Sequence, residues 1–318
     1  AANFAADVTF ADGADIITAT AGTSNFRAGV GAGDSILSGG NFNVCVGDQA
    51  GTTITLADHN TLVGFNSGAL LLTGGENTLL GDAAGEALDV GIQNIAVGYL
   101  ALTNDTKGST STAVGVAALA TQNFTTATNS FNTAVGYDAG AAVTTGTENT
   151  LIGGKAGDAL TTGFTNVAVG VNSLGTEIAG RKNVAIGYDA LSTQNNDADT
   201  LNTAVGYDAG KAVTTGVQNV LIGGLAGDAL TDADFNVGVG YGALGADTLG
   251  NRSTAVGHNA LTAQNFTSAT SVHNCAFGFA AGQAVTTGNN NSFFGAQAGL
   301  AVTTGTGNSY IGTLAGDG

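Results

Sequence analysis

Proline, methionine and tryptophan are absent from the 318 residues, and only 10% of the residues are charged. A chain without proline can offer nearly all of its backbone N–H groups to a hydrogen-bonded ladder. Basic residues are also scarce, since 7 Lys and Arg against 24 Asp and Glu leave a net charge of −17. That balance argues against nucleic-acid phosphates and anionic membrane surfaces as partners. No apolar run approaches the length of a transmembrane helix, so we expect no membrane insertion.

Glycine, in contrast, supplies 52 residues, and it recurs at fixed positions. The stretch 132–148, NTAVGYDAGAAVTTGTE, returns 17 residues later as NTLIGGKAGDALTTGFT and then as NVAVGVNSLGTEIAGRK. A fixed short period is typical of a solenoid, in which each repeat forms one coil stacked on the last. The repeated phrase begins 17 times, at residues 25, 43, 60, 77, 94, 111, 132, 149, 166, 183, 202, 219, 236, 253, 274, 291 and 308. We therefore predict an all-β fold, a parallel β-solenoid (β-roll) of about 17 coils with a 17-residue repeat.

The chain divides into an off-pattern segment, 1–24, and a repeat domain, 25–318. The first segment contains two short apolar runs around an Asp-Gly turn, and we expect it to be a cap or a docking segment. Longer spacings after residues 111, 183 and 253 insert extra residues, which must bulge outward. These insertions define super-repeats of four coils, with the last one truncated: 60–131, 132–201, 202–273 and 274–318.

We number the positions of a coil from its opening residue, which is Asn in 15 of 17 coils. Stacked Asn side chains at position 1 can hydrogen-bond along a column. Position 4 is almost always Val, Ile, Leu or Phe, and we expect it to point into the core. Position 5 is Gly in every coil, which indicates a positive φ or a wall too close for a Cβ. Position 8 is Ala or Ser from Ala50 onward, a tight inward site, and Thr-Thr-Gly at positions 13–15 predicts a second short strand and a turn.

The two cysteines, Cys45 and Cys275, lie 230 residues apart in the sequence. At about 4.8 Å per coil they are roughly 60 Å apart in space, which excludes an intrachain disulfide. Both fall in the apolar strand phrase. We expect two small core residues, with an intermolecular bridge as the alternative.

The phrase N-[TSV]-[AL]-[VI]-G-x-x-A-[GL] resembles the head repeats of trimeric autotransporter adhesins. It is more similar still to the N-T-A-V-G-Y-x-A-L repeats of tail-fibre-like proteins. The resemblance covers residues 25–318. It implies a parallel β-roll, usually trimeric, with a fibrous and adhesive role outside the cell. The adhesin head coil is shorter than 17 residues, and no coiled-coil stalk or membrane-anchor barrel is visible in this sequence.

No catalytic, cofactor-binding or metal site is predicted. His59, His258 and His273 fall in different coils, so no nucleophile–base pair can be assembled from their spacing. The calcium-binding nonapeptide of other β-rolls is absent. Asp189 and Asp208 occupy the same position in adjacent coils, where a cation is the alternative to a solvated face. An ice-binding Thr array is not expected, because the Thr-Thr pairs are interrupted and adjacent residues point to opposite faces.

Two further patterns leave alternatives open. Aromatic residues follow the position 5 glycine in many coils, and they form either a subunit contact or a sugar-stacking stripe; they are Phe65, Tyr99, Tyr137, Tyr188, Tyr207, Tyr241 and Phe279. The N-glycosylation acceptor pattern occurs at Asn104, Asn123 and Asn265, where decoration of the bulges is a hypothesis.

The sequence thus predicts a non-enzymatic extracellular structural protein that forms a fibre or filament by homo-oligomerisation, for scaffolding or surface attachment. The expected partner is the chain itself, as a trimer, an end-to-end polymer or both. The alternative is a virion or cell-surface fibre segment that binds a glycan receptor. The candidate assembly residues are Val8, Phe10, Ile16, Ile17, Tyr310 and Ile311, and the candidate exposed loop residues are Asn123, Phe124, Asn195, Asn265 and Phe266.

Overall fold

The computed structural model describes residues 21–317, which form a single column of about 17 stacked parallel coils. Within this range the chain contains short strands joined by turns, and no helix. The predicted β-solenoid is confirmed. One strand per coil builds a 17-stranded sheet along the column. Its strands are β1 (Phe26–Ala28), β2 (Val44–Val46), β3 (Thr61–Val63), β4 (Thr78–Leu80), β5 (Ile95–Val97), β7 (Thr112–Val114), β9 (Thr133–Val135), β10 (Thr150–Ile152), β11 (Val167–Val169), β12 (Val184–Ile186), β13 (Thr203–Val205), β14 (Val220–Ile222), β15 (Val237–Val239), β17 (Thr254–Val256), β19 (Cys275–Phe277), β20 (Ser292–Phe294) and β21 (Ser309–Ile311).

The strands pair in parallel, and every residue faces its equivalent in the next coil. Thr150 pairs with Thr133 on one side and with Val167 on the other. The longer coils keep this register, since Thr133 of β9 pairs with Thr112 of β7 across the first insertion. The inserted residues therefore leave the sheet as loops, as the spacing predicts.

The side chains of the sheet alternate between the inside and the outside of the coil. Position 3 points inward: Ala134, Leu151 and Ala168 are completely buried. Position 4 was expected to be the core position, and that prediction is wrong, because Val135 is half-buried and Ile152 and Phe294 are exposed on the outer side. The buried Asn of position 1 points inward, so the alternation of the strand turns position 3 inward as well and position 4 outward.

Position 5 has both properties that the sequence suggests. At Gly136 φ is +140°, and an added Cβ would lie 2.5 Å from the carbonyl oxygen of Gly153 in the next coil. This backbone conformation and this close approach each exclude an ordinary side chain. The glycine lets the chain turn sharply at the end of every strand.

The opening asparagines form a buried ladder through the column. The side chain of Asn149 donates through Nδ2 to the carbonyl of Gly163, 2.9 Å away, and its Oδ1 accepts the backbone N–H of Asn166 at 3.1 Å. Each such amide ties its own coil to the next and closes the coil across its width. Buried polar groups satisfied in this way hold the register of the stack.

The rest of the coil consists of turns. Positions 8 and 12 point inward, as Ala139 and Val143 show by their complete burial. The second strand expected at Thr-Thr-Gly is absent from regular coils within residues 21–317, where that segment bends. Its backbone still bonds to the next coil, for example Thr144 N–H to the Thr161 carbonyl at 2.9 Å.

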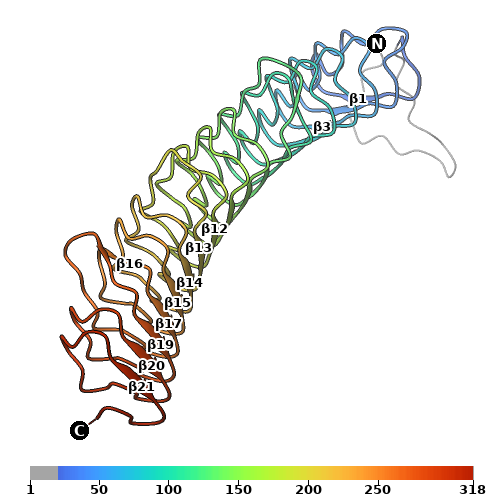
Figure 1. Cartoon of the computed structure of the whole chain (residues 1–318). Coiled ribbons are helices and arrows are strands. Elements are labelled where there is room, and N and C mark those ends of the chain that lie inside the picture. Colours follow the sequence, from blue (N-terminus) through green and yellow to red (C-terminus); the bar gives the residue numbers. More distant parts are fainter. Residues whose placement is uncertain (1–20, 318) are drawn as a thin grey trace, which may run out of the picture.

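The column is not straight. It bends into an arch, and the strands β12 to β21 of the main sheet follow its inner side (Figure 1). The opposite, outer side carries the turns and β16 (Gly250–Asn251), which pairs with β18 (Thr270–Ser271). A second small pair, β6 (Gly108–Ser109) and β8 (Thr128–Asn129), forms in the same part of an earlier super-repeat. The long sheet face therefore lies on the concave side of the arch.

Candidate functional site

The largest continuous feature of the surface is the outer face of the main sheet. We call it the sheet face and define it as positions 2, 4 and 6 of each coil. Position 2 is mostly Thr or Val and position 4 mostly Val or Ile, and both are half-buried or exposed. Position 6 projects further, with Tyr137 and Tyr207 each 58% exposed. The sheet face is thus an apolar strip that runs along all 17 strands.

Charge is almost excluded from this strip. The chain carries 24 acidic residues, yet Asp48 and Asp82 are the only fully charged residues among positions 2, 4 and 6 of the described coils. Contiguous apolar surface of this kind marks an interaction site in a water-soluble protein. A sheet surface that stays in contact with water can carry charged side chains at no cost. The near absence of charge here therefore indicates that the sheet face is covered.

The aromatic side chains of position 6 stack on one another along the column. The rings of Tyr188 and Tyr207 lie 5.6 Å apart and 10° from parallel. His258 stacks between Tyr241 and Phe279, at 5.3 and 5.5 Å. Because these ring faces are turned towards each other, the stacked rings present edges outward. Sugar stacking uses a ring face, so these stacks are poor sugar platforms.

The interior of the column holds a feature that the sequence analysis missed. At position 12 the core residue is normally Val, Leu or Ile, but the third coil of each super-repeat has a carboxylate and the fourth has Gln. The carboxylates are Asp105, Glu177 and Asp247, and the amides are Gln122, Gln194 and Gln264; all six are completely buried. Each pair forms a polar layer inside the column, one per complete super-repeat.

The first polar layer shows how the buried charge is accommodated. Asp105 accepts hydrogen bonds from Gln122 Nε2 at 2.6 Å, Gly108 N–H at 2.9 Å and Phe124 N–H at 3.2 Å. Gln122 also bonds to Ser111 Oγ at 2.7 Å. These donors replace water around the carboxylate. The sequence signal was available: an acid at position 12, where most other coils have Val, Leu or Ile.

The glycine at position 15, which is also present in coils without the acid, leaves room for the carboxylate. A Cβ on Gly108 would lie 2.0 Å from Asp105 Oδ2, and one on Gly180 would lie 2.4 Å from Glu177 Oε2. Phe124 belongs to the insertion loop that follows in the fourth coil. The polar layer therefore attaches the inserted loop to the core of the preceding coil.

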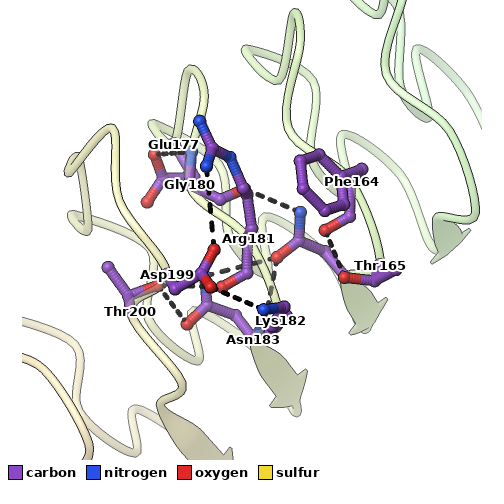
Figure 2. Close-up of polar contacts among 10 residues, drawn as sticks. Phe164, Thr165, Glu177, Gly180, Arg181, Lys182, Asn183, Asp199 and Thr200 are labelled. Carbon is purple, nitrogen blue, oxygen red and sulfur yellow. Dashed lines mark hydrogen bonds and ion pairs between the residues drawn. The ribbon is translucent and has the colours of Figure 1, made fainter.

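The loop of the second super-repeat is also held by ion pairs (Figure 2). Asp199 lies 2.5 Å from Lys182 Nζ and 3.7 Å from Arg181, and the guanidinium of Arg181 sits 5.0 Å from the ring centre of Phe164. The hydrogen bond from Lys182 lowers the pKa of Asp199. Arg252 stacks on Phe235 in the same way one super-repeat later, at 5.0 Å. The side chains within each of these two groups bind one another, so we assign both groups a structural role.

The candidate loop residues divide into two groups. Asn123, Asn195 and Asn265 are exposed, as expected. Phe124 and Phe266 are 5% and 8% exposed, so the prediction that they are exposed contacts is wrong. Their backbone N–H groups bond to the buried carboxylates, which draws the aromatic rings into the column.

The candidate assembly residues cannot all be located. Val8, Phe10, Ile16 and Ile17 lie outside the described residues. Tyr310 packs against the core and stacks on Phe293 at 6.0 Å. Ile311 is 79% exposed at position 4 of the last coil. It extends the sheet face to the last described strand.

A lysine lies between the two aspartates for which a cation was considered. Lys211 Nζ is 2.9 Å from Asp189 and 3.2 Å from Asp208. Burial raises the pKa of Asp189, but hydrogen bonds from Asn172 and Lys211 outweigh burial and lower it. The described residues contain no group of three or more His, Cys, Asp or Glu side chains that could hold a metal ion.

The cysteines differ from each other. Cys45 is completely buried at position 3, and burial raises the pKa of its thiol to about 11. Cys275 stands at position 2, on the sheet face, and is half-buried. The prediction that Cys275 is a core residue is therefore wrong, because the strand alternation turns it outward. Burial raises the pKa of its thiol as well.

Among residues 21–317, no helix is long and apolar enough to cross a membrane. The three histidines remain separated along the column, with His258 exposed in the aromatic stack. The chain matches no protein-family model, no curated protein and no solved structure. Its function must therefore be argued from the sheet face, the polar layers and the loops themselves.

Proposed function

We propose that the protein is a non-enzymatic extracellular structural protein that forms a fibre by homo-oligomerisation through its sheet face. The observation that carries the proposal is the apolar strip along all 17 strands, which holds only two charged residues in an otherwise acidic chain. Burial of such a strip against another copy removes apolar side chains from water, which favours association.

The thin interior of the column supports the same proposal. Most inward residues are Ala, Leu or Val, and large buried side chains such as Phe293 are few in the described coils. A solenoid stabilised mainly by neighbour contacts gains from association along its length. The concave placement of the sheet face suits columns that wind around a common axis, each with its apolar side inward (Figure 1).

The proposal also draws on the sequence resemblance to tail-fibre-like and adhesin-head repeats, whose members are fibrous and adhesive. In this chain the acidic outer loops supply solubility and the sheet face supplies contact. Scaffolding or surface attachment follows as the role of such a fibre outside the cell.

The experiment that tests the proposal is sedimentation of the purified protein, together with electron microscopy. Oligomers or filaments at micromolar concentration are expected for the wild type. The double variant Val135→Glu/Val205→Glu places two charges on the sheet face and should shift the protein to monomer. The control Thr145→Glu/Thr162→Glu adds the same charge at exposed turn positions and should assemble normally. A wild type that stays monomeric contradicts the proposal.

The second candidate is a fibre segment that binds a glycan receptor. It is favoured by the exposed amides of Asn123, Asn195 and Asn265, which recur once per super-repeat in the outer loops. Such amides can hydrogen-bond to sugar hydroxyls. A glycan array distinguishes the candidates, since saturable binding that is lost in Asn195→Ala would favour the receptor-binding role.

A further inference from the structure

The projecting residues of position 6 follow a four-coil rule. The first coil of every super-repeat has an aromatic ring there: Phe65, Tyr137, Tyr207 and Phe279. The second coil has a small or short residue: Asp82, Gly154, Gly224 and Ala296. The sheet face therefore carries a projecting ring and, one coil further on, a notch. This pair repeats along the column at intervals of about 19 Å.

Gly154 shows that the notch is not demanded by the fold of the chain. Its φ does not lie in the left-handed region, in contrast to its neighbour Gly153 at +134°. A Cβ added to Gly154 would meet no atom within 4 Å. Any residue could stand there without strain or clash, so the empty volume is available to something outside the chain.

Gly224 is likewise not demanded by the fold, although its notch is less open than that at Gly154. An added Cβ would lie 3.5 Å from the ring of Tyr241, which is ordinary van der Waals contact. Its φ is also outside the left-handed region. The ring of Tyr241 in the next coil lines this notch, so it is narrower than the open notch at Gly154.

The size of the sheet face indicates what covers it. Seventeen strands at ~4.8 Å and the reach from position 2 to position 6 at ~3.3 Å per residue give a strip of about 1,000 Å², above the ~800 Å² per partner of a stable interface. The strip is nearly free of charge, which excludes an ionic partner. A second copy of the chain carries the same long apolar strip with the same interval between ring and notch.

We propose that the sheet face docks against a second copy of this chain in fixed axial registers, because position 6 rings of one copy fill the notches of the other. The inference rests on the proposed function. It adds that the registers in which first-coil rings meet the notches recur in steps of one super-repeat, and that shifts which leave the notches empty are disfavoured. Unfilled volume and overpacking both cost stability.

Filling the notch from within tests the inference. Gly154→Tyr should weaken association at least 10-fold by sedimentation equilibrium while the monomer keeps its β-sheet circular dichroism. The matched control is Val116→Tyr, an exposed fourth-coil position that does not adjoin a notch and where the next super-repeat already has Tyr188. It should associate within about twofold of the wild type. Equal association of Gly154→Tyr and the wild type would overturn the register rule, and equal weakening by both variants would do the same.

A second measurement leaves the notch residues unchanged and maps the contacts of a position 6 ring directly. The photo-cross-linking amino acid p-benzoylphenylalanine replaces Tyr137, and the variant is mixed with an isotope-labelled wild type. Cross-links should concentrate on labelled peptides around Gly154 and its equivalents at 82, 224 and 296. Cross-links spread evenly over all coils of an assembled protein would contradict the fixed registers but leave the fibre intact. A wild type that does not assemble would instead contradict the proposed function itself.

Discussion

Asn149 donates its backbone N–H to Oδ1 of Asn132, 3.0 Å away in the preceding coil, and its own Oδ1 then accepts from Asn166. Where Ser replaces Asn the incoming bond is kept, since Ser253 donates its N–H to Asn236 Oδ1 at 2.9 Å, but Ser has no amide oxygen to pass the relay to the next coil. One side chain per coil thus fixes the vertical alignment of the stack. From Asn43 to Asn291 the opening residues are at most 1% exposed, so their bonds are shielded from competition with water.

A break in the ladder should destabilise the column locally. Asn166→Ala removes the acceptor for Asn183 N–H and the donor to the Gly180 carbonyl, 3.0 and 2.9 Å away. Two buried groups without partners should cost about 2–4 kcal/mol. Urea unfolding followed by circular dichroism measures the loss. The exposed Asn195→Ala serves as control and should stay within about 0.5 kcal/mol of the wild type.

The strand-end glycines should tolerate no substitution. Gly136→Ala combines φ of +140° with a contact of 2.5 Å to the Gly153 carbonyl oxygen, and we expect a loss of more than about 2 kcal/mol. Gly154→Ala, without strain or contact, should change the free energy of unfolding by less than about 0.5 kcal/mol. Thermal melts of the two variants suffice. Similar losses at both sites would show that the predicted difference in backbone geometry is wrong.

The stability of the polar layers should depend on the hydrogen-bond acceptor at position 12 and not on the hydrophobicity of the residue there. Asp105→Leu restores the residue type that Leu88 has at the same position, yet it leaves Gly108 N–H, Phe124 N–H and Gln122 Nε2 without their acceptor. We expect a loss of at least about 3 kcal/mol. Asp105→Asn keeps one oxygen and should cost less. Hydrogen exchange of the 122–130 loop should rise in the Leu variant, because the loop loses its attachment.

The pair of Lys211 and Asp189 should give a pH-dependent contribution to stability. The folded pKa of Asp189 is lowered, so the stabilisation is present above the unfolded value of ~3.9 and is lost as the pH falls through the folded value. The stability difference between the wild type and Lys211→Met should therefore be full at pH 7 and vanish towards pH 2. A difference that grows on acidification would have the wrong sign.

The two thiols should react at very different rates. Cys275 on the sheet face should be alkylated by iodoacetamide at pH 8 at least ten times faster than Cys45, whose thiol is buried and has a pKa of about 11. Assembly through the sheet face should slow the reaction of Cys275 relative to the monomeric Val135→Glu/Val205→Glu variant. Mass spectrometry of the two cysteine peptides over time gives both rates.

The sequence predicted the coil number, the parallel register and the strand-end glycines, because each depends on a period that is visible in the chain. It gave the wrong direction for the strand side chains. In Thr133-Ala134-Val135 the larger apolar residue was assumed to point inward, but Asn132 is buried and the alternation of the strand then turns Ala134 inward and Val135 outward. Which side of the strand faces the core is set by the closed coil and is not visible in a three-residue run.

The loop residues and the buried acids illustrate another limit. Phe124 lies in a polar, Thr-rich insertion, which is typical of an exposed loop, yet it is buried because Asp105 binds its backbone. Asp105 itself lies 17 residues before Gln122, and a bond between equivalent positions of adjacent coils becomes visible only once the coils are aligned. An aligned repeat table would have shown an acid and an amide stacked in a core column.

The four-coil unit has a consequence for how the length of the column can change in evolution. Residues 132–201 begin and end at equivalent points of the repeat, and their strands pair with neighbours whose register is the same on both sides. Excision or duplication of such a segment would join matching coils without a new turn or core. Gain or loss of one super-repeat in the gene would thus change the length of the column by about 19 Å and leave its fold unchanged.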